Sequence, residues 1–434
     1  MENLDYARLQ MAFTLGFHII FACIGMVMPF FMVVSHKKWL NTRDPLYLSL
    51  TKAWQKGVAI FFVTGAVSGT ALSFELGMLW PEFMKHAGPI IGMPFSLEGA
   101  AFFVEAIALG FYLYGWNRLP EKFHWYTGII IGISGVASGI LVVSANAWMN
   151  APSGFDYING EFINIDPVKA FLNEAWFSQA LHMTLAAFVA TSFAVAGIHA
   201  FQIYRNKRPR LHKKAFKIAI MFGAVSAILQ PLSGDFSAKE IAIRQPVKLA
   251  AMEAHFETQK GAPLFIGGIV DEKEQKVDYK LEIPGALSFL AFGDFDAEVK
   301  GLNDFPEDEL PPIAIVHYAF QIMVGLGTLL MLAGFIYFWS TRKKSLLQDK
   351  KGFWLFFVLL SPLGFLALEA GWTITEVGRQ PWIIYQIMRT GEAVTPMPGI
   401  KYSFFTYVLV YVSLAITVSW LMKRQIKVLN ALKD

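Results

Sequence analysis

Long apolar stretches separated by shorter polar segments dominate the chain. A helix that crosses a bilayer takes about 20 mostly apolar residues. Nine stretches meet that requirement, and they cover residues 12–34, 57–79, 95–116, 126–148, 176–203, 218–233, 312–339, 353–375 and 402–421. The sixth is the shortest, because Gln230, Pro231 and Asp235 crowd its end. The pattern predicts an all-α, polytopic membrane bundle of about nine helices.

Composition supports a membrane protein over a soluble one. Only 16% of the 434 residues are charged and 55% are hydrophobic, whereas ordinary soluble domains carry roughly a quarter charged residues. The net charge of +4 is too small to indicate a nucleic-acid partner. Cys23 is the single cysteine, so an intrachain disulfide and a cysteine metal cluster are excluded. Residues 1–10 lack the features of a removable signal peptide, and we expect the first stretch to remain as a membrane helix.

Basic residues predict the orientation of the bundle. One set of alternate connections holds 23 of the 37 Lys and Arg residues, and the short segments on the other side hold 6. Because cytoplasmic loops carry the excess of Lys and Arg, we expect the N-terminus outside and the C-terminus in the cytoplasm. This divides the chain into six helices (1–233), an extracytoplasmic loop (234–311), and three helices with a cytoplasmic tail (312–434).

The long connection at 234–311 is acidic, with 8 of the 37 basic residues and 16 of the 33 acidic ones. A loop of this length is usually functional or disordered. Leu249, Met252 and Phe256 recur at helical spacing, so residues 246–257 are predicted to be helical. Residues 271–279 are charged and turn-like.

Several polar groups lie inside the predicted spans. Glu98 and Glu105 are seven residues apart, two helical turns, and therefore share one face. Such acids either are neutralised by protonation or a neighbouring helix, or form a proton path; spacing favours neither. Three glycine pairs at four-residue spacing, Gly65/Gly69, Gly128/Gly132 and Gly135/Gly139, predict close helix packing.

Four further side chains fall at similar depth in the predicted outer half of the bundle. They are His18, His182, Met323 and Glu376. Each alone is explained as a hydrogen-bonded or packed core group. Together, on different helices, they suggest ligands of buried haem irons, which helical bundles hold between facing helices. Lys248 and Glu253, out in the loop, would ordinarily be solvated charges.

The stretch 371–382 places a carboxylate, a guanidinium and two indoles beside an apolar run. Charge that close to hydrocarbon usually has a function or a partner. The alternative is a helix end at the membrane surface, with interfacial Trp372 and Trp382 and a stop at Pro381.

Several dispersed motifs together resemble subunit I of the cytochrome bd quinol oxidases, of the short Q-loop type, over essentially the whole chain. The strongest are Lys248-Leu249-Ala250-Ala251-Met252-Glu253, Gln321-Ile322-Met323-Val324-Gly325, and Glu376 followed by Gly378-Arg379-Gln380-Pro381-Trp382; Arg8-Leu9-Gln10, Asn146-Ala147-Trp148-Met149 and Gly234-Asp235 add to them.

This resemblance implies three haems. His182 and Met323 would ligate a low-spin haem b. His18 and Glu376 would each hold one of two high-spin haems, one b and one d, with the assignment between them left open. Trp372 and Arg379 would lie beside the haems, where arginine binds propionates bidentately.

The resemblance also implies roles for the remaining charged residues. Glu98 and Glu105 match proton-path acids, and Lys248 and Glu253 match the quinol-site pair. The family often has a basic residue at the position of Gln321, so we expect the lost cation to lower the potential of the neighbouring haem.

The implied activity is a quinol:dioxygen oxidoreductase of the bacterial cytoplasmic membrane, which oxidises quinol at the outer face, reduces dioxygen to water and separates charge across the membrane. A second integral membrane subunit, and a small single-span one, would be its partners. Two other classes compete: a transporter or channel without haem, whose intramembrane acids line a path, and a haem-bearing quinol dehydrogenase that does not consume oxygen.

Overall fold

The computed structural model describes residues 3–342 and 347–431. Within these residues nine helical spans are long and apolar enough to cross a membrane, which confirms the predicted number. They are α1 (Asn3–Thr42), α2 (Pro45–Leu79), α3 (Pro81–Tyr114), α4 (Glu121–Asn150), α6 (Trp176–Tyr204), α7 (Pro209–Arg244), α10 (Ile313–Arg342), the consecutive pair α11 (Lys351–Leu360) and α12 (Leu363–Val377), and α14 (Ile400–Ala431).

Most helices extend well beyond their apolar centres. The largest difference is α7, which continues through Pro231 to Arg244 and has 36 residues. The helix therefore extends past the predicted sixth span into the segment assigned to the loop, because backbone hydrogen bonding continues where hydropathy falls. The eighth predicted span is divided into α11 and α12 at Ser361 and Pro362.

The connections contain short elements that an all-helical pattern does not show. Short helices are α5 (Pro167–Phe171), α8 (Pro246–Glu253), α9 (Ala286–Phe292) and α13 (Thr390–Ala393), with 3-10 turns at Leu302–Asp304 and Glu307–Glu309. The strands form five antiparallel pairs: β1 (Asp156–Ile158) with β2 (Glu161–Ile163), β3 (Gln259–Lys260) with β8 (Glu298–Val299), β4 (Leu264–Ile266) with β7 (Leu281–Ile283), β5 (Ile269–Asp271) with β6 (Lys276–Asp278), and β9 (Trp382–Ile384) with β10 (Met388–Arg389). The turn-like stretch 271–279 is thus mostly a hairpin, and the helix predicted to 257 ends at Glu253.

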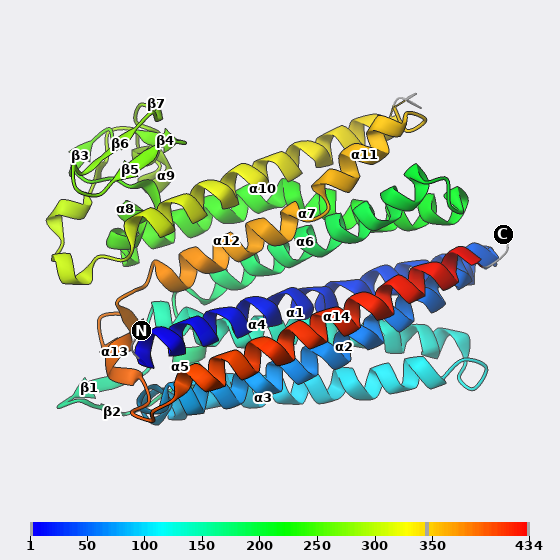
Figure 1. Ribbon diagram of the computed structural model, residues 1–434, viewed down its shortest axis with the longest axis horizontal. Coiled ribbons are helices and arrows are strands. Elements are labelled where there is room, and N and C mark those ends of the chain that lie inside the picture. Colours follow the sequence, from blue (N-terminus) through cyan, green and yellow to red (C-terminus); the bar gives the residue numbers. More distant parts are fainter. Residues whose placement is uncertain (1–2, 343–346, 432–434) are drawn as a thin grey trace.

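The long helices form two groups that lie side by side (Figure 1). One group contains α1 to α4 and α14, and the other contains α6, α7, α10, α11 and α12. They meet where α1 and α4 pack against α6. The N-terminus, α5, α8 and α13 lie at one end of the molecule, and the C-terminus lies at the other (Figure 1).

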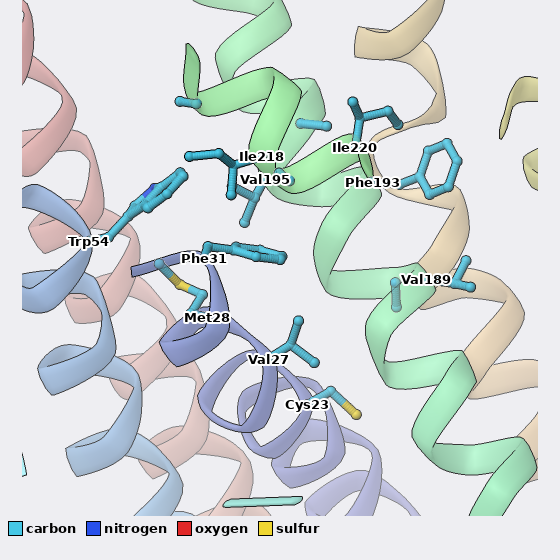
Figure 2. Close-up of a cluster of buried hydrophobic side chains, with 14 of the residues drawn as sticks. Cys23, Val27, Met28, Phe31, Trp54, Val189, Phe193, Val195, Ile218 and Ile220 are labelled. Atoms are coloured by element: carbon cyan, nitrogen blue, oxygen red, sulfur yellow. The ribbon is translucent and has the colours of Figure 1, made fainter. Parts of the chain in front are cut away.

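An apolar core fills the junction between the groups. Figure 2 shows buried side chains of this core on α1, α2, α6 and α7, among them Cys23, Phe31, Trp54 and Phe193. Cys23 is 3% exposed and packs within this core.

Glycines on α4 let its neighbours approach closely. A Cβ atom at Gly128 would lie 2.7 Å from the Tyr112 ring, and one at Gly139 would lie 3.1 Å from Met26 Sδ. The predicted close packing is confirmed there. It is wrong for Gly65, where an added Cβ would meet nothing within 4 Å, while Gly69 faces His18.

Candidate active site

His18 lies on α1 and faces α2. Its Nδ1 is 2.9 Å from the Ser68 hydroxyl, and a Cβ atom at Gly69 would lie 3.0 Å from the ring. A histidine whose one nitrogen is held by a hydrogen bond presents the other with a fixed orientation, which is the usual arrangement of a metal-ligating imidazole. The missing side chain at Gly69 leaves room beside the ring.

His182 and Met323 lie in the second helix group and show the same feature. His182 Nδ1 is 3.0 Å from Ser233 Oγ on α7. A Cβ atom at Gly234 would lie 3.6 Å from the His182 ring, and one at Gly371 would lie 3.1 Å from Met323 Sδ. Each of the three candidate iron ligands other than Glu376 therefore faces a glycine on a neighbouring helix.

Gln230 competes for the second nitrogen of His182. Its amide Nε2 lies 3.1 Å from His182 Nε2 and 3.2 Å from the His182 carbonyl oxygen. An amide N–H can only donate, so Nε2 of His182 carries the lone pair that an iron would use. Gln230 would have to turn away for His182 to ligate a metal.

Glu376, at the end of α12, is held by two donors. Asn146 on α4 donates to Oε1, and Arg379 donates to Oε2 at 2.7 Å. Arg379 is 2% exposed, yet its Nη1 has no hydrogen-bond partner among the described residues. A buried guanidinium N–H without an acceptor fits an anionic group such as a haem propionate. Trp372, one helical turn before Glu376 on α12, packs at the edge of the main core.

A chain of polar contacts connects Glu376 to the long loop. Asn146 holds Glu376, and Asn150, one turn further along α4, donates to the Asn146 carbonyl at 2.9 Å. Lys248 on α8 donates to Asn150 Oδ1 and to the Thr375 carbonyl, each at 3.2 Å. The sequence showed Asn146 as part of a motif without a role and did not single out Asn150, because contacts between helices leave no periodic signal.

Lys248 and Glu253, which the resemblance assigns to one quinol site, have different surroundings in the structure. Lys248 is buried against the end of α12. Burial, followed by the charge of Arg379, lowers the pKa of Lys248 to about 7, and Glu376 partly opposes that shift. Lys248 therefore belongs to the surroundings of Glu376 as much as to the loop.

Glu253 closes α8 and is completely buried. Neither of its carboxylate oxygens has a hydrogen-bond partner in residues 3–342 and 347–431. Burial raises the pKa of Glu253 to about 8, and the nearby backbone N–H of Phe265, which lies outside hydrogen-bonding geometry, partly opposes the rise. Two histidines that the sequence analysis did not select are also buried. His255 lies two residues after Glu253, and His317 contacts the Met252 carbonyl; the Nε2 atom of each lacks a described partner.

Glu98 and Glu105 share one face of α3, as their spacing predicted, and that face packs against α4. Ser138 donates to Glu98 at 3.1 Å, and Glu105 Oε2 lies 3.6 Å from a Cβ atom placed on Gly135. Two other intramembrane acids differ in their surroundings. Glu75 is bonded by α1 side chains, and Glu369 Oε1 is buried without a described partner.

The candidate iron-ligating side chains do not cluster, so each suits a metal that takes only one or two ligands from the protein. Across the described part of the chain, no group of three His, Cys, Asp or Glu side chains could hold a metal ion. Haem iron needs only one or two protein ligands because the macrocycle supplies the rest. His18, His182 and Met323 with their facing glycines, and Arg379 with its free N–H, fit that requirement.

Comparison with known proteins agrees with this interpretation. The family model for cytochrome bd terminal oxidase subunit I matches residues 6–429. A Bacillus subtilis (strain 168) protein named as a cytochrome bd menaquinol oxidase subunit I is 37% identical over 416 residues, 94% of this chain and 93% of the relative. The cytochrome bd ubiquinol oxidase subunit 1 of the same organism is 30% identical over 441 residues, 98% of this chain and 94% of the relative.

A solved structure is equally similar. The bd oxidase of Geobacillus thermodenitrificans superposes with a TM-score of 0.93 at 37% identity, covering 98% of both chains. The match extends over all nine spans and both helix groups, so it supports the fold as well as the motifs. This chain belongs to the cytochrome bd terminal oxidase subunit I family.

Proposed function

We propose that the chain is the haem-bearing subunit of a terminal oxidase that oxidises quinol and reduces dioxygen to water. The observation that carries this proposal is the arrangement of His18, His182 and Met323, each facing a glycine on a neighbouring helix. Family membership supports it, because the named relatives are quinol oxidase subunits.

His182 and Met323 are proposed to hold one haem b, and His18 and Glu376 one high-spin haem each, b and d. Bound haem would supply the electron transfer and the reduction of dioxygen. The protein contributes orientation and charge: Ser68 and Ser233 fix the two imidazoles, and Arg379 offers an N–H to a propionate.

Quinol is proposed to bind at the end of α8, where Glu253 is the base that takes up a hydroxyl proton. A buried carboxylate whose pKa lies near 8 holds a proton more readily than an ordinary glutamate. Lys248 is proposed to position this region against Glu376 through Asn150 and Asn146.

Protons for water are proposed to come from the cytoplasm along Glu98 and Glu105. This requires the N-terminus and the long loop outside, and the C-terminus inside. Support for that orientation comes from the end opposite the loop, where the α1–α2, α3–α4 and α6–α7 connections lie (Figure 1). These connections hold basic residues such as Arg43, Arg118 and Arg208. The proposed location is the bacterial cytoplasmic membrane, in complex with a second membrane subunit and a small single-span one.

A reduced-minus-oxidised spectrum of the purified protein, with oxygen uptake on quinol addition, tests the proposal. Haem bands and uptake are expected. A transporter would give neither, and a quinol dehydrogenase would give the bands without uptake.

His182→Ala is expected to remove the low-spin signal and leave the high-spin ones; an unchanged low-spin band would refute the ligand assignment.

A further inference from the structure

His317 is a buried histidine that the proposed function does not yet use. It lies in the first turns of α10 and is 0% exposed. Its Nδ1 is 2.9 Å from the carbonyl oxygen of Met252. A carbonyl can only accept, so the hydrogen bond places the ring proton on Nδ1 and leaves the lone pair on Nε2.

The partner of His317 places it beside Glu253. The Met252 carbonyl belongs to the peptide bond that joins Met252 to Glu253, the last residue of α8. Carbonyl groups in the last turn of a helix lack intrahelical partners, and His317 satisfies this one. The ring of His317 is therefore fixed against the backbone of the proposed quinol base.

Three acceptor atoms at this helix end have no partner among the described residues. They are Nε2 of His317 and both carboxylate oxygens of Glu253. Buried polar atoms are nearly always hydrogen-bonded in native proteins. Around them the packing is apolar, with Ala250, Val316 and Phe320 in one cluster. Fixed acceptors in an apolar surrounding are typical of a ligand site whose ligand donates hydrogen bonds.

The same face of α10 is also hydrogen-bonded to the long loop at residues 265–267. Gln321, one turn after His317, donates to the Phe265 carbonyl at 2.8 Å and accepts from the Gly267 N–H at 3.2 Å. His317 and Gln321 together therefore connect α10 to both ends of the segment between α8 and β4, where the proposed quinol site lies.

We propose that His317 is a second proton acceptor of the quinol site, receiving a hydrogen bond at Nε2 from one quinol hydroxyl while Glu253 receives the other. On oxidation of the quinol, the O–H bond breaks and an N–H bond forms at Nε2, which makes the imidazole an imidazolium. The second hydroxyl proton goes to Glu253, and the two electrons leave one at a time, each to a ferric haem, the oxidant that the proposed function supplies. The inference rests on that function.

Two substitutions separate the two nitrogens of His317. In His317→Asn the amide lies where Nδ1 lies, so the bond to Met252 is kept and the Nε2 acceptor is lost. In His317→Gln the amide oxygen can reach the Nε2 position, but an amide cannot take up a proton. His36→Asn is the matched control. His36 is also 0% exposed, its Nδ1 is 2.8 Å from Tyr112 Oη, and its Nε2 has no described partner. It lies near the C-terminal end of α1, far from the loop.

The experiment measures binding without turnover. The full oxidase, reduced with dithionite in the absence of oxygen, is titrated by calorimetry with decylubiquinol or a short-chain menaquinol, whichever the wild type oxidises, and the oxidised protein with the matching quinone. We expect His317→Asn to weaken quinol binding about tenfold, the value of one hydrogen bond. Quinone binding should change little, since a quinone has no hydroxyl to donate. His317→Gln should recover quinol binding but not turnover, and His36→Asn should bind as wild type.

Two results would overturn the inference. One is quinol binding and turnover by His317→Asn equal to those of the wild type. The other is equal loss of quinol and quinone binding together with a lower melting temperature, which would make His317 a purely structural residue. A wild type that contains no haem or oxidises no quinol would instead refute the proposed function.

Discussion

Two carboxylates of this protein, Glu75 and Glu253, are both 0% exposed, yet their surroundings differ completely. Glu75 on α2 accepts from Gln10 at 2.9 Å and from Thr14 at 2.5 Å, so α1 provides a donor for each of its oxygens. Glu253 has a described hydrogen-bond partner for neither oxygen. Burial alone does not distinguish the two.

The hydrogen bonds do distinguish them. A buried carboxylate with partners joins two helices and contributes to stability, whereas one without partners costs stability unless a ligand satisfies it. Glu75 therefore belongs to the scaffold that holds α1, and with it His18, against α2. Glu253 belongs to the site. Substitutions at the two positions should consequently affect different measurements.

The largest effect is expected for Glu253→Gln. The amide keeps the shape of the side chain but cannot accept a proton, so quinol-dependent oxygen uptake should fall at least about a hundredfold. The melting temperature should stay near that of the wild type. Glu257→Gln, four residues along the chain and exposed, is the control and should retain full activity. Retention of uptake by Glu253→Gln would remove Glu253 from the quinol site.

For Glu75→Ala we expect the reverse. Gln10 would lose the acceptor of its amide inside the bundle, while Thr14 can still donate to the Gln10 carbonyl. Leaving a buried donor unsatisfied lowers the free energy of unfolding by about 2 kcal/mol. Thermal unfolding in detergent measures this loss, and turnover per bound haem measures function. If turnover fell while the melting temperature did not, Glu75 would belong to a proton path and the comparison with Glu253 would fail.

The contrast also shows what sequence can provide. Hydropathy predicted nine spans, and helical periodicity predicted that Glu98 and Glu105 share a face, because both properties belong to single helices. The partners of Glu75, the contact of Lys248 with Asn150, and the bond between His317 and Met252 depend on how helices distant in sequence pack. No single-sequence pattern contains that information.

Resemblance provided a different kind of information. The motifs around Met323 and Glu376 carried the family assignment, although nothing in their local pattern required a haem. The same resemblance assigned Lys248 and Glu253 to one site without stating their contacts, and in the structure Lys248 contacts the Thr375 carbonyl. Residues shared with a family therefore suggest a site without giving its internal contacts.

The pH dependence of quinol oxidation sharpens the assignment of Glu253. Its pKa is raised to about 8 by burial, so the proton-accepting form is the minority at pH 7 and predominates at pH 9. We expect kcat/KM to rise about tenfold over that interval, with an inflection near pH 8, as for a base in the free enzyme. Lys248, whose pKa is about 7, titrates in the same range. The inflection should therefore remain in Lys248→Met; its disappearance there would assign it to the lysine.

Substitution of Gln321 is expected to have the smallest effect but the most specific one. Gln321 is hydrogen-bonded to the loop and lies two residues before the proposed haem ligand Met323. Its amide holds the loop at Phe265 and Gly267, and Met323 follows two residues later. Gln321→Arg should raise the midpoint potential of the low-spin haem by some tens of millivolts, since a charge interaction of about 1 kcal/mol corresponds to roughly 40 mV for one electron.

Gln321→Leu separates charge from structure at this position. It removes the same hydrogen bonds without adding a cation, so both variants should raise the KM for quinol a few-fold while only the arginine moves the potential. Redox titration followed by low-spin absorbance measures the shift. An unchanged potential in Gln321→Arg would mean that residue 321 acts only by holding the loop. In that case Gln321 resembles Glu75, a partnered group of the scaffold, and the unsatisfied atoms of Glu253 and His317 alone mark where quinol binds.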